Sequence, residues 1–161
     1  MKDISYKSSI KVYDDYHELA DKQIVALCNQ SISAMQDAYA PYSKFQVGAA
    51  LLLDDGTLIH GNNQENAVYP LGLCAERVTL YAASSQYPDH TITHLAVTTR
   101  KELSKGELPP FPCGSCRQVL LEMEQRYNQD IKIYVIGSDK SVCVLDTVRD
   151  LLPFAFSKQS L

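Results

Sequence analysis

Three cysteines are spaced in a way that predicts a catalytic zinc site. Cys74 lies upstream of a Cys-x-x-Cys motif formed by Cys113 and Cys116. Three thiolates fill three positions of a tetrahedral zinc ion and leave the fourth open to water, which distinguishes a catalytic zinc site from a closed structural one. Glu76, two residues after the first thiol, can stand beside the metal without binding it. Chemistry that uses a zinc-bound water needs a proton carrier at that place, and we expect Glu76 to be it.

Other interpretations of the cysteines must be weighed. A Cys-x-x-Cys motif alone also fits a redox pair or half of a structural zinc site. A closed site needs a fourth ligand, but Cys28, Cys143 and the four histidines lie far from both motifs along the chain. A non-catalytic, zinc-stabilised interaction domain is the remaining alternative, and such a domain has no use for a carboxylate at Glu76. The pattern favours an enzyme.

Composition favours a small cytoplasmic enzyme. The 161 residues suffice for a single domain over residues 14–161, preceded by an extension over residues 1–13. No apolar run predicts a membrane span, and the polar start lacks the core of a signal peptide. Five cysteines, an odd number with three assigned to metal, argue for a reducing compartment. A net charge of −4 without a basic surplus argues against long nucleic acid as a partner.

The apolar pattern predicts alternating helices and strands around these motifs. Asp15 with Glu18 resembles a capping box at the start of the first helix. Helices are expected over residues 16–39, 74–84 and 114–127 and briefly after Thr147, and strands over 46–53, 57–61, 91–99, 131–136 and 142–145. This order predicts an α/β layered sheet with helices on both faces.

Both cysteine motifs fall where a loop enters a predicted helix. The thiolates would therefore lie at two helix N-termini, where free backbone N–H groups and the helix dipole favour negative charge. Three thiolates on a divalent zinc ion leave a net charge of −1, which weakens the metal as a Lewis acid. Arg77 is placed to hydrogen-bond a ligand sulfur and drain this charge, and Arg117 is a second candidate. For either arginine a structural ion pair is the alternative.

The sequence resembles the zinc-dependent cytidine deaminases of nucleoside salvage, in their small, homotetrameric, three-cysteine branch. The resemblance extends from about Ala38 to Phe156 and includes the Pro-Cys-x-x-Cys motif of zinc deaminases. It implies a three-layer α/β/α cytidine deaminase-like fold with a five-stranded mixed sheet, and one Zn²⁺ per subunit. Five blocks carry it: Tyr39–Phe45, Val47–Leu51, Glu65–Ala67, Cys74–Arg77 and Pro112–Val119.

The resemblance also implies the substrate contacts. Phe45 would pack on the pyrimidine ring, although a core position is an alternative. Asn63 and Glu65 would hydrogen-bond the ribose hydroxyls, with turn formation as their alternative. Phe156 would reach into the pocket of an adjacent subunit, and Tyr69 would lie near the subunit contact, unless the C-terminal segment folds back on its own domain. The expected partners are thus a nucleoside and three further copies of the chain.

The expected reaction is hydrolytic deamination of cytidine, with deoxycytidine as a further substrate, by a zinc-bound hydroxide with Glu76 as proton shuttle. Two related enzymes are alternatives: a blasticidin S deaminase-like enzyme acting on a cytosine-nucleoside antibiotic, and an RNA or DNA editing deaminase. Asn63 and Glu65 argue against the first, and the acidic charge balance argues against the second. The apolar residues Ile4, Tyr6, Ile10 and Val12 share one parity, so the extension is either an extra edge strand or a tail.

Overall fold

A mixed six-stranded sheet organises the chain in the computed structural model, which describes residues 1–161. The strands follow the order β1-β6-β5-β4-β2-β3, and only β4 and β5 run parallel. The mixed α/β class is confirmed, but the predicted number of five strands is wrong, because the N-terminal extension adds one. The strands are β1 (Lys11–Tyr13), β2 (Val47–Leu53), β3 (Leu58–Asn62), β4 (Ile92–Thr99), β5 (Lys132–Ile136) and β6 (Val142–Leu145).

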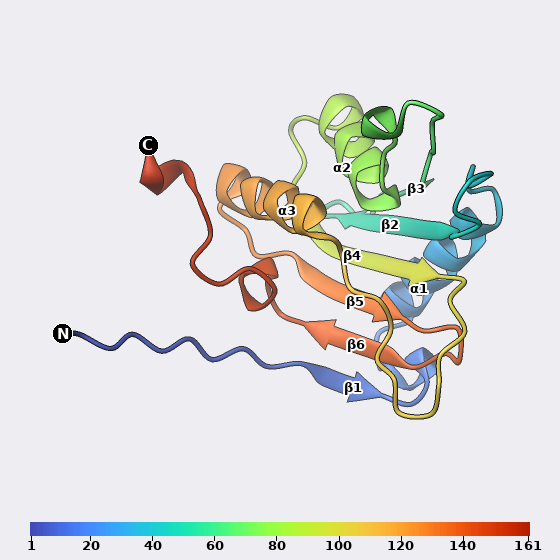
Figure 1. Cartoon of the computed structure of the whole chain (residues 1–161), viewed down its shortest axis with the longest axis horizontal. Coiled ribbons are helices and arrows are strands. Elements are labelled where there is room, and N and C mark those ends of the chain that lie inside the picture. The colour runs from blue at the N-terminus through green and yellow to red at the C-terminus, as the bar shows by residue number, and fades with distance from the viewer.

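Three α-helices cover the two faces of this sheet (Figure 1). They are α1 (Lys22–Gln36), which packs on one face, and α2 (Ala75–Gln86) and α3 (Gly114–Tyr127), which lie on the other. Short 3-10 helices occupy Tyr16–Glu18, Tyr69–Leu71, Val148–Asp150 and Lys158–Ser160. No helix combines the length and the apolar composition that a membrane span requires.

Strand β2 separates the two halves of the hydrophobic core. Ala49 and Leu51 belong to the cluster under α2 and α3, whereas Ala50 and Leu52 belong to the cluster under α1. Adjacent residues of a strand point to opposite faces, so a run of buried apolar residues is expected where both faces are covered. Gly48 lets α1 approach closely, because a Cβ atom there would lie 2.0 Å from the Ser31 carbonyl oxygen.

The first helix is shorter than predicted at both ends. Asp15 caps only the 3-10 helix, accepting a hydrogen bond from the His17 N–H at 2.9 Å. Asp21 caps α1 instead, accepting from the Gln23 N–H at 2.8 Å. Both aspartates are competent N-caps, so the sequence alone did not decide between them.

The N-terminal extension is partly a strand. Lys11–Tyr13 pairs antiparallel with β6, so that Lys11 lies opposite Val144 and Tyr13 opposite Val142. Residues 1–10 have no regular secondary structure and are exposed. The edge-strand alternative therefore holds for three residues only.

A buried carboxylate anchors the C-terminal end of α3. Glu124 is 1% exposed and accepts hydrogen bonds from the backbone N–H groups of Ile131 and Val148 and from the Thr147 hydroxyl, at 2.9–3.0 Å. Several donors satisfy the charge that burial would otherwise penalise. Glu124 thereby fixes the position of α3, whose other end carries two of the three predicted metal ligands.

Candidate active site

The three predicted thiols lie together at the N-termini of α2 and α3. Cys74 is the N-cap residue of α2, Cys113 is the N-cap residue of α3, and Cys116 lies in the first turn of α3. The Sγ atom of Cys113 is 3.8 Å from that of Cys74 and 3.4 Å from that of Cys116, and all three sulfurs lie within 4.8 Å of one another. Tetrahedral zinc with Zn–S bonds of about 2.3 Å separates its sulfur ligands by roughly 3.8 Å. The donor set therefore fits zinc.

The surroundings favour a thiolate at Cys74. A hydrogen bond with Cys116 and another from Arg77 lower the pKa of Cys74 to about 5, against the opposing effect of burial. Cys116 donates the proton in the hydrogen bond to Cys74. This donation and the burial of Cys116 both raise the pKa of the Cys116 thiol. Metal binding requires deprotonated thiols, so a site that already favours one thiolate is prepared for a cation.

The two arginine candidates behave differently. The Nη2 atom of Arg77 lies 3.8 Å from the Sγ atom of Cys74 and 3.5 Å from the carbonyl oxygen of Gly72. Arg117 does not contact a sulfur; it donates to the carbonyl oxygens of Pro112 at 2.7 Å and Leu151 at 2.9 Å. Arg117 thus holds the loop before α3 to the C-terminal segment through backbone carbonyl groups, so that both the predicted sulfur contact and the alternative ion pair are wrong for this residue.

Glu76 is buried beside the thiols. It lies in the first turn of α2, is 4% exposed and lines the same cavity as Cys74 and Cys113. Burial raises the pKa of this carboxyl group above its usual value. The residue therefore has the location expected of a proton carrier.

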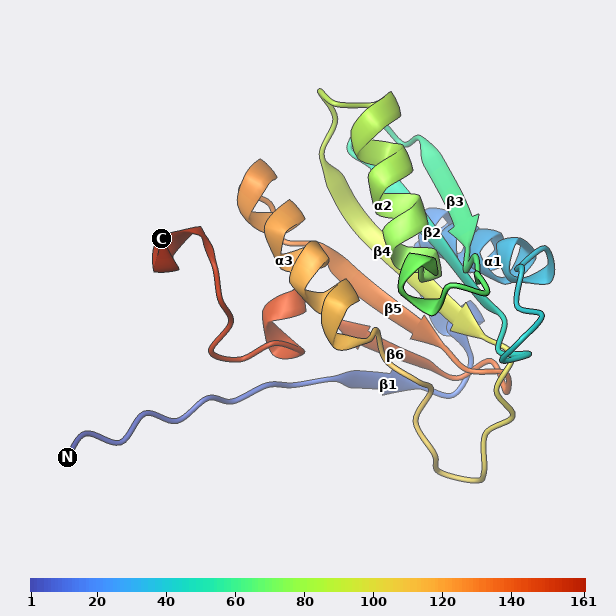
Figure 2. The same ribbon diagram turned by 45° about the horizontal axis from the view of Figure 1, so that its top comes forward.

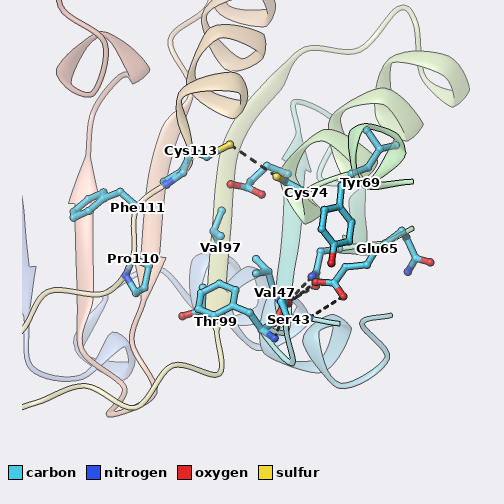
Figure 3. A pocket seen from close by; sticks show the side chains of 17 residues that line it. Ser43, Val47, Glu65, Tyr69, Cys74, Val97, Thr99, Pro110, Phe111 and Cys113 are labelled. Atoms are coloured by element: carbon cyan, nitrogen blue, oxygen red, sulfur yellow. Dashed lines mark hydrogen bonds between the residues drawn. The ribbon is translucent and has the colours of Figure 1, made fainter. Parts of the chain in front are cut away.

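A cavity of about 500 Å³ brings the predicted site residues together. It lies at the carboxyl end of β4, where open α/β sheets commonly bind ligands. In Figure 3 the sulfurs of Cys74 and Cys113 point toward each other, and Tyr69 and Glu65 lie on the side of Cys74 that faces away from Cys113. The predicted residues that line it are Phe45, Asn63, Glu65, Tyr69, Cys74, Glu76 and Cys113.

Glu65 is held in place by the segment before β2. It accepts hydrogen bonds from the backbone N–H groups of Tyr42 at 2.9 Å and Ser43 at 3.2 Å, and from the Ser43 hydroxyl. These bonds, the one from the hydroxyl foremost, hold the pKa of Glu65 below its usual value. The carboxylate is therefore ionised and oriented at the wall of the cavity.

Asn63 connects β3 to the start of β2. Its Oδ1 atom accepts from the Val47 N–H and its Nδ2 group donates to the Phe45 carbonyl oxygen, both at 2.9 Å. One amide hydrogen and one acceptor position remain for another partner. Asn63 thus orients the segment that carries Phe45, whose ring is partly exposed at the cavity.

Tyr69 lies at the outer wall, and Phe156 lies elsewhere. The rings of Tyr69 and Tyr42 meet edge to face with centroids 6.0 Å apart. Phe156 is 62% exposed and is not among the residues that line the cavity of its own chain. Its carbonyl oxygen accepts from Gln118 Nε2 on α3 at 2.9 Å.

Several lining residues were not predicted from the sequence. Ser43 fixes Glu65, and Val97 and Thr99 form the end of β4 at the cavity. Phe111 lies directly before the second cysteine motif, in a stretch whose lack of periodicity gave no structural signal. A usable signal was the end of the predicted strand 91–99, because strand ends border ligand sites in such sheets.

Comparisons with known proteins identify the family. The cytidine and deoxycytidylate deaminase zinc-binding region matches residues 21–128. The cytidine deaminase of Halalkalibacterium halodurans is 40% identical over 141 residues, which cover 88% of this chain and 98% of the relative. The cytidine deaminase of Sporosarcina psychrophila is 42% identical over 135 residues, which cover 84% of this chain and 92% of the relative. The crystal structure of cytidine deaminase from Burkholderia pseudomallei aligns with a TM-score of 0.71 at 38% identity, covering 82% of this chain and 98% of that one.

The matched region contains the three clustered thiols and the buried Glu76. The chain therefore belongs to the cytidine and deoxycytidylate deaminase family of zinc-dependent enzymes.

Proposed function

We propose that this enzyme hydrolyses cytidine, and also deoxycytidine, to the corresponding uridine nucleoside and ammonia. One observation carries the proposal: a buried carboxyl group and two thiols of the three-thiol cluster line a single cavity with Asn63 and Glu65, which can hydrogen-bond a sugar. The metal half of the cavity accounts for hydrolysis at a carbon–nitrogen bond. The part of the cavity formed by Asn63 and Glu65 accounts for a substrate that carries a sugar, which is a nucleoside rather than a free base.

Glu76 would move protons between water and substrate. Zinc, held by the three cysteines, would supply Lewis acidity and lower the pKa of water. Glu76 takes a proton from the attacking water and delivers it to the ring nitrogen beside the reacting carbon. It then transfers the second proton of that water, from the hydroxyl group now on the reacting carbon, to the exocyclic amine; the carbon–nitrogen bond breaks, ammonia leaves and the carbonyl bond forms. Because Glu76 is buried and fixed on the first turn of α2, the same carboxyl group is held in place for both transfers.

The remaining side chains would position the nucleoside. Glu65 accepts a hydrogen bond from a ribose hydroxyl, and Asn63 uses its free amide hydrogen and acceptor position for a second one. Phe45 packs on the pyrimidine ring. Holding the reacting carbon at a fixed place turns an encounter into an effectively unimolecular reaction.

An absorbance assay tests the reaction directly. Purified protein is incubated with cytidine, deoxycytidine and free cytosine, and the loss of ultraviolet absorbance is followed. Both nucleosides should be consumed and ammonia released in equal amount, whereas cytosine should react far more slowly. Equal rates for cytosine and cytidine would show that the ribose contacts are wrong.

Glu65→Gln should weaken nucleoside handling without removing zinc. A hydrogen bond to a charged acceptor contributes about 1.5–3 kcal/mol, which corresponds to a roughly 10- to 150-fold loss in kcat/KM for cytidine. Kinetics with parallel metal analysis measures this, and Glu102→Gln, which changes an exposed glutamate outside the cavity, is the control. An unchanged kcat/KM in the Glu65 variant would contradict the ribose role.

We also propose a cytoplasmic homotetramer, active in pyrimidine salvage, whose sites are completed by neighbouring subunits. Its support is the exposure of Phe156 and Tyr69, which lie uncovered on the single chain, and the five free thiols, which suit a reducing compartment. Phe156 would enter a neighbour's cavity, with Tyr69 near the contact.

Removing the C-terminal residues tests the shared site. Light scattering on the intact protein should give about four times the 18.0 kDa chain mass. Deleting residues 155–161 should lower kcat/KM at least about 10-fold although every zinc ligand remains, because a substrate contact from the neighbouring subunit is lost. A fully active monomer would disprove the shared site and leave the zinc chemistry untouched.

A further inference from the structure

The two terminal segments of the chain meet at one end of the molecule. In both Figure 1 and Figure 2 the N-terminal segment passes beside the bend of the C-terminal segment. The ring of Tyr6 lies 6.2 Å from that of Phe154, tilted by 58°. The Tyr6 hydroxyl also donates a hydrogen bond to the backbone carbonyl oxygen of Arg149, in the 3-10 helix that precedes the bend. One side chain of the extension therefore contacts the C-terminal segment at two points.

The bend of the C-terminal segment is strained and poorly buried. Phe154 has a φ of +55°, a left-handed conformation that costs a bulky residue about 1–3 kcal/mol. Its side chain is 76% exposed, so burial compensates little of that cost. Such a conformation persists only where surrounding contacts determine it.

Contacts with α3 hold the segment on either side of this bend. Before it, Arg117 donates to the Leu151 carbonyl oxygen at 2.9 Å. After it, Gln118 donates to the carbonyl oxygen of Phe156, and Lys158 Nζ donates to that of Gln125 at 3.2 Å. The ring contact of Tyr6 falls between these two groups, at the strained residue itself, and its hydrogen bond to the Arg149 carbonyl oxygen lies just before them.

We propose that Tyr6 braces the C-terminal segment and is thereby a positioning residue for Phe156. The kinetic part of this inference rests on the proposed entry of Phe156 into a neighbour's site. The brace itself depends only on contacts within one chain. It assigns a role to an extension that lies outside the matched family region.

Hydrogen exchange of the zinc-loaded, full-length protein tests the brace. In Tyr6→Ala the backbone amides of Leu152 and of residues 154–158 should exchange about 5- to 10-fold faster than in wild type, because an aromatic contact and a hydrogen bond are lost. Tyr6→Phe keeps the ring contact and should show a smaller increase. Ile4→Ala is the matched control, since Ile4 is an exposed apolar residue of the same extension. Unchanged exchange in Tyr6→Ala would overturn the brace.

A double-mutant cycle tests the link to Phe156. Tyr6→Ala and Phe156→Ala should each raise the KM for cytidine at least about threefold, with kcat within about twofold, and the double variant should resemble Phe156→Ala alone. Additive effects would overturn the positioning role. If Phe156→Ala left KM unchanged, the shared site and the positioning role would both be wrong, whereas the exchange measurement would still decide the brace.

Discussion

Glu76→Gln is expected to retain zinc and the fold but to lose nearly all turnover. Glutamine has the shape of glutamate and can occupy the same buried place on α2, but its amide cannot accept and release a proton. General acid–base groups contribute typically about 10²- to 10⁴-fold to a rate, and Glu76 would serve two proton transfers, so the loss in kcat should reach at least this range.

Three measurements on the Glu76 variant separate this outcome from unfolding. Metal analysis should give one zinc per chain, circular dichroism should match wild type, and the cytidine assay should give the lowered kcat. Glu122→Gln changes an exposed glutamate on α3 and serves as the control that retains full activity. A Glu76→Gln enzyme working at a tenth of the wild-type rate would contradict the assignment of Glu76.

Cys113→Ala is expected to lose the metal and a large share of the stability. The Sγ atom of Cys113 lies 3.8 Å from that of Cys74 and 3.4 Å from that of Cys116, and its removal would leave two of the three ligands. A ligand present at about 1,000 times its Kd stabilises the folded state by about 4 kcal/mol. For a domain of this size that amounts to a fall in Tm of about 8–16 °C.

Thermal unfolding with and without a chelator checks this prediction. Chelator should lower the Tm of wild type toward that of Cys113→Ala and should leave the variant unchanged. Cys143→Ala is the matched control, because this buried cysteine lies outside the cluster and its loss should reduce packing but keep the zinc. A Cys113→Ala protein that holds one zinc per chain would rule out the proposed ligand set.

The sequence predicted the sheet well where periodicity and turn residues agree. The bounds predicted for α3 and β6 match the structure. The edge strand was harder to predict, because Lys11–Tyr13 gains its strand conformation from pairing with β6 rather than from its own pattern. Long-range pairing of this kind is not encoded in any local window.

The site was predicted where residue chemistry is specific and missed where geometry decides. The ligands Cys74, Cys113 and Cys116 were evident because zinc chemistry needs few residue types at fixed spacing. Ser43 and Phe111 are common residue types whose importance comes from the places to which the fold brings them. The two arginines show the same difference. Both follow a cysteine motif closely enough in the sequence to contact a sulfur, but in the fold Arg117 donates to backbone carbonyl groups instead.

The pairing of β1 with β6 also bears on how the protein avoids aggregation. Val142–Leu145 is entirely buried and apolar, so without β1 its backbone N–H and C=O groups would present an apolar edge to any other strand. The outer strand β1 is three residues long and carries Lys11, which pairs with Asp146 at 3.5 Å. A short, charged strand is a poor template for further pairing. A shortened chain that begins at residue 14 would lack this protection and should self-associate during refolding, even with every catalytic group in place.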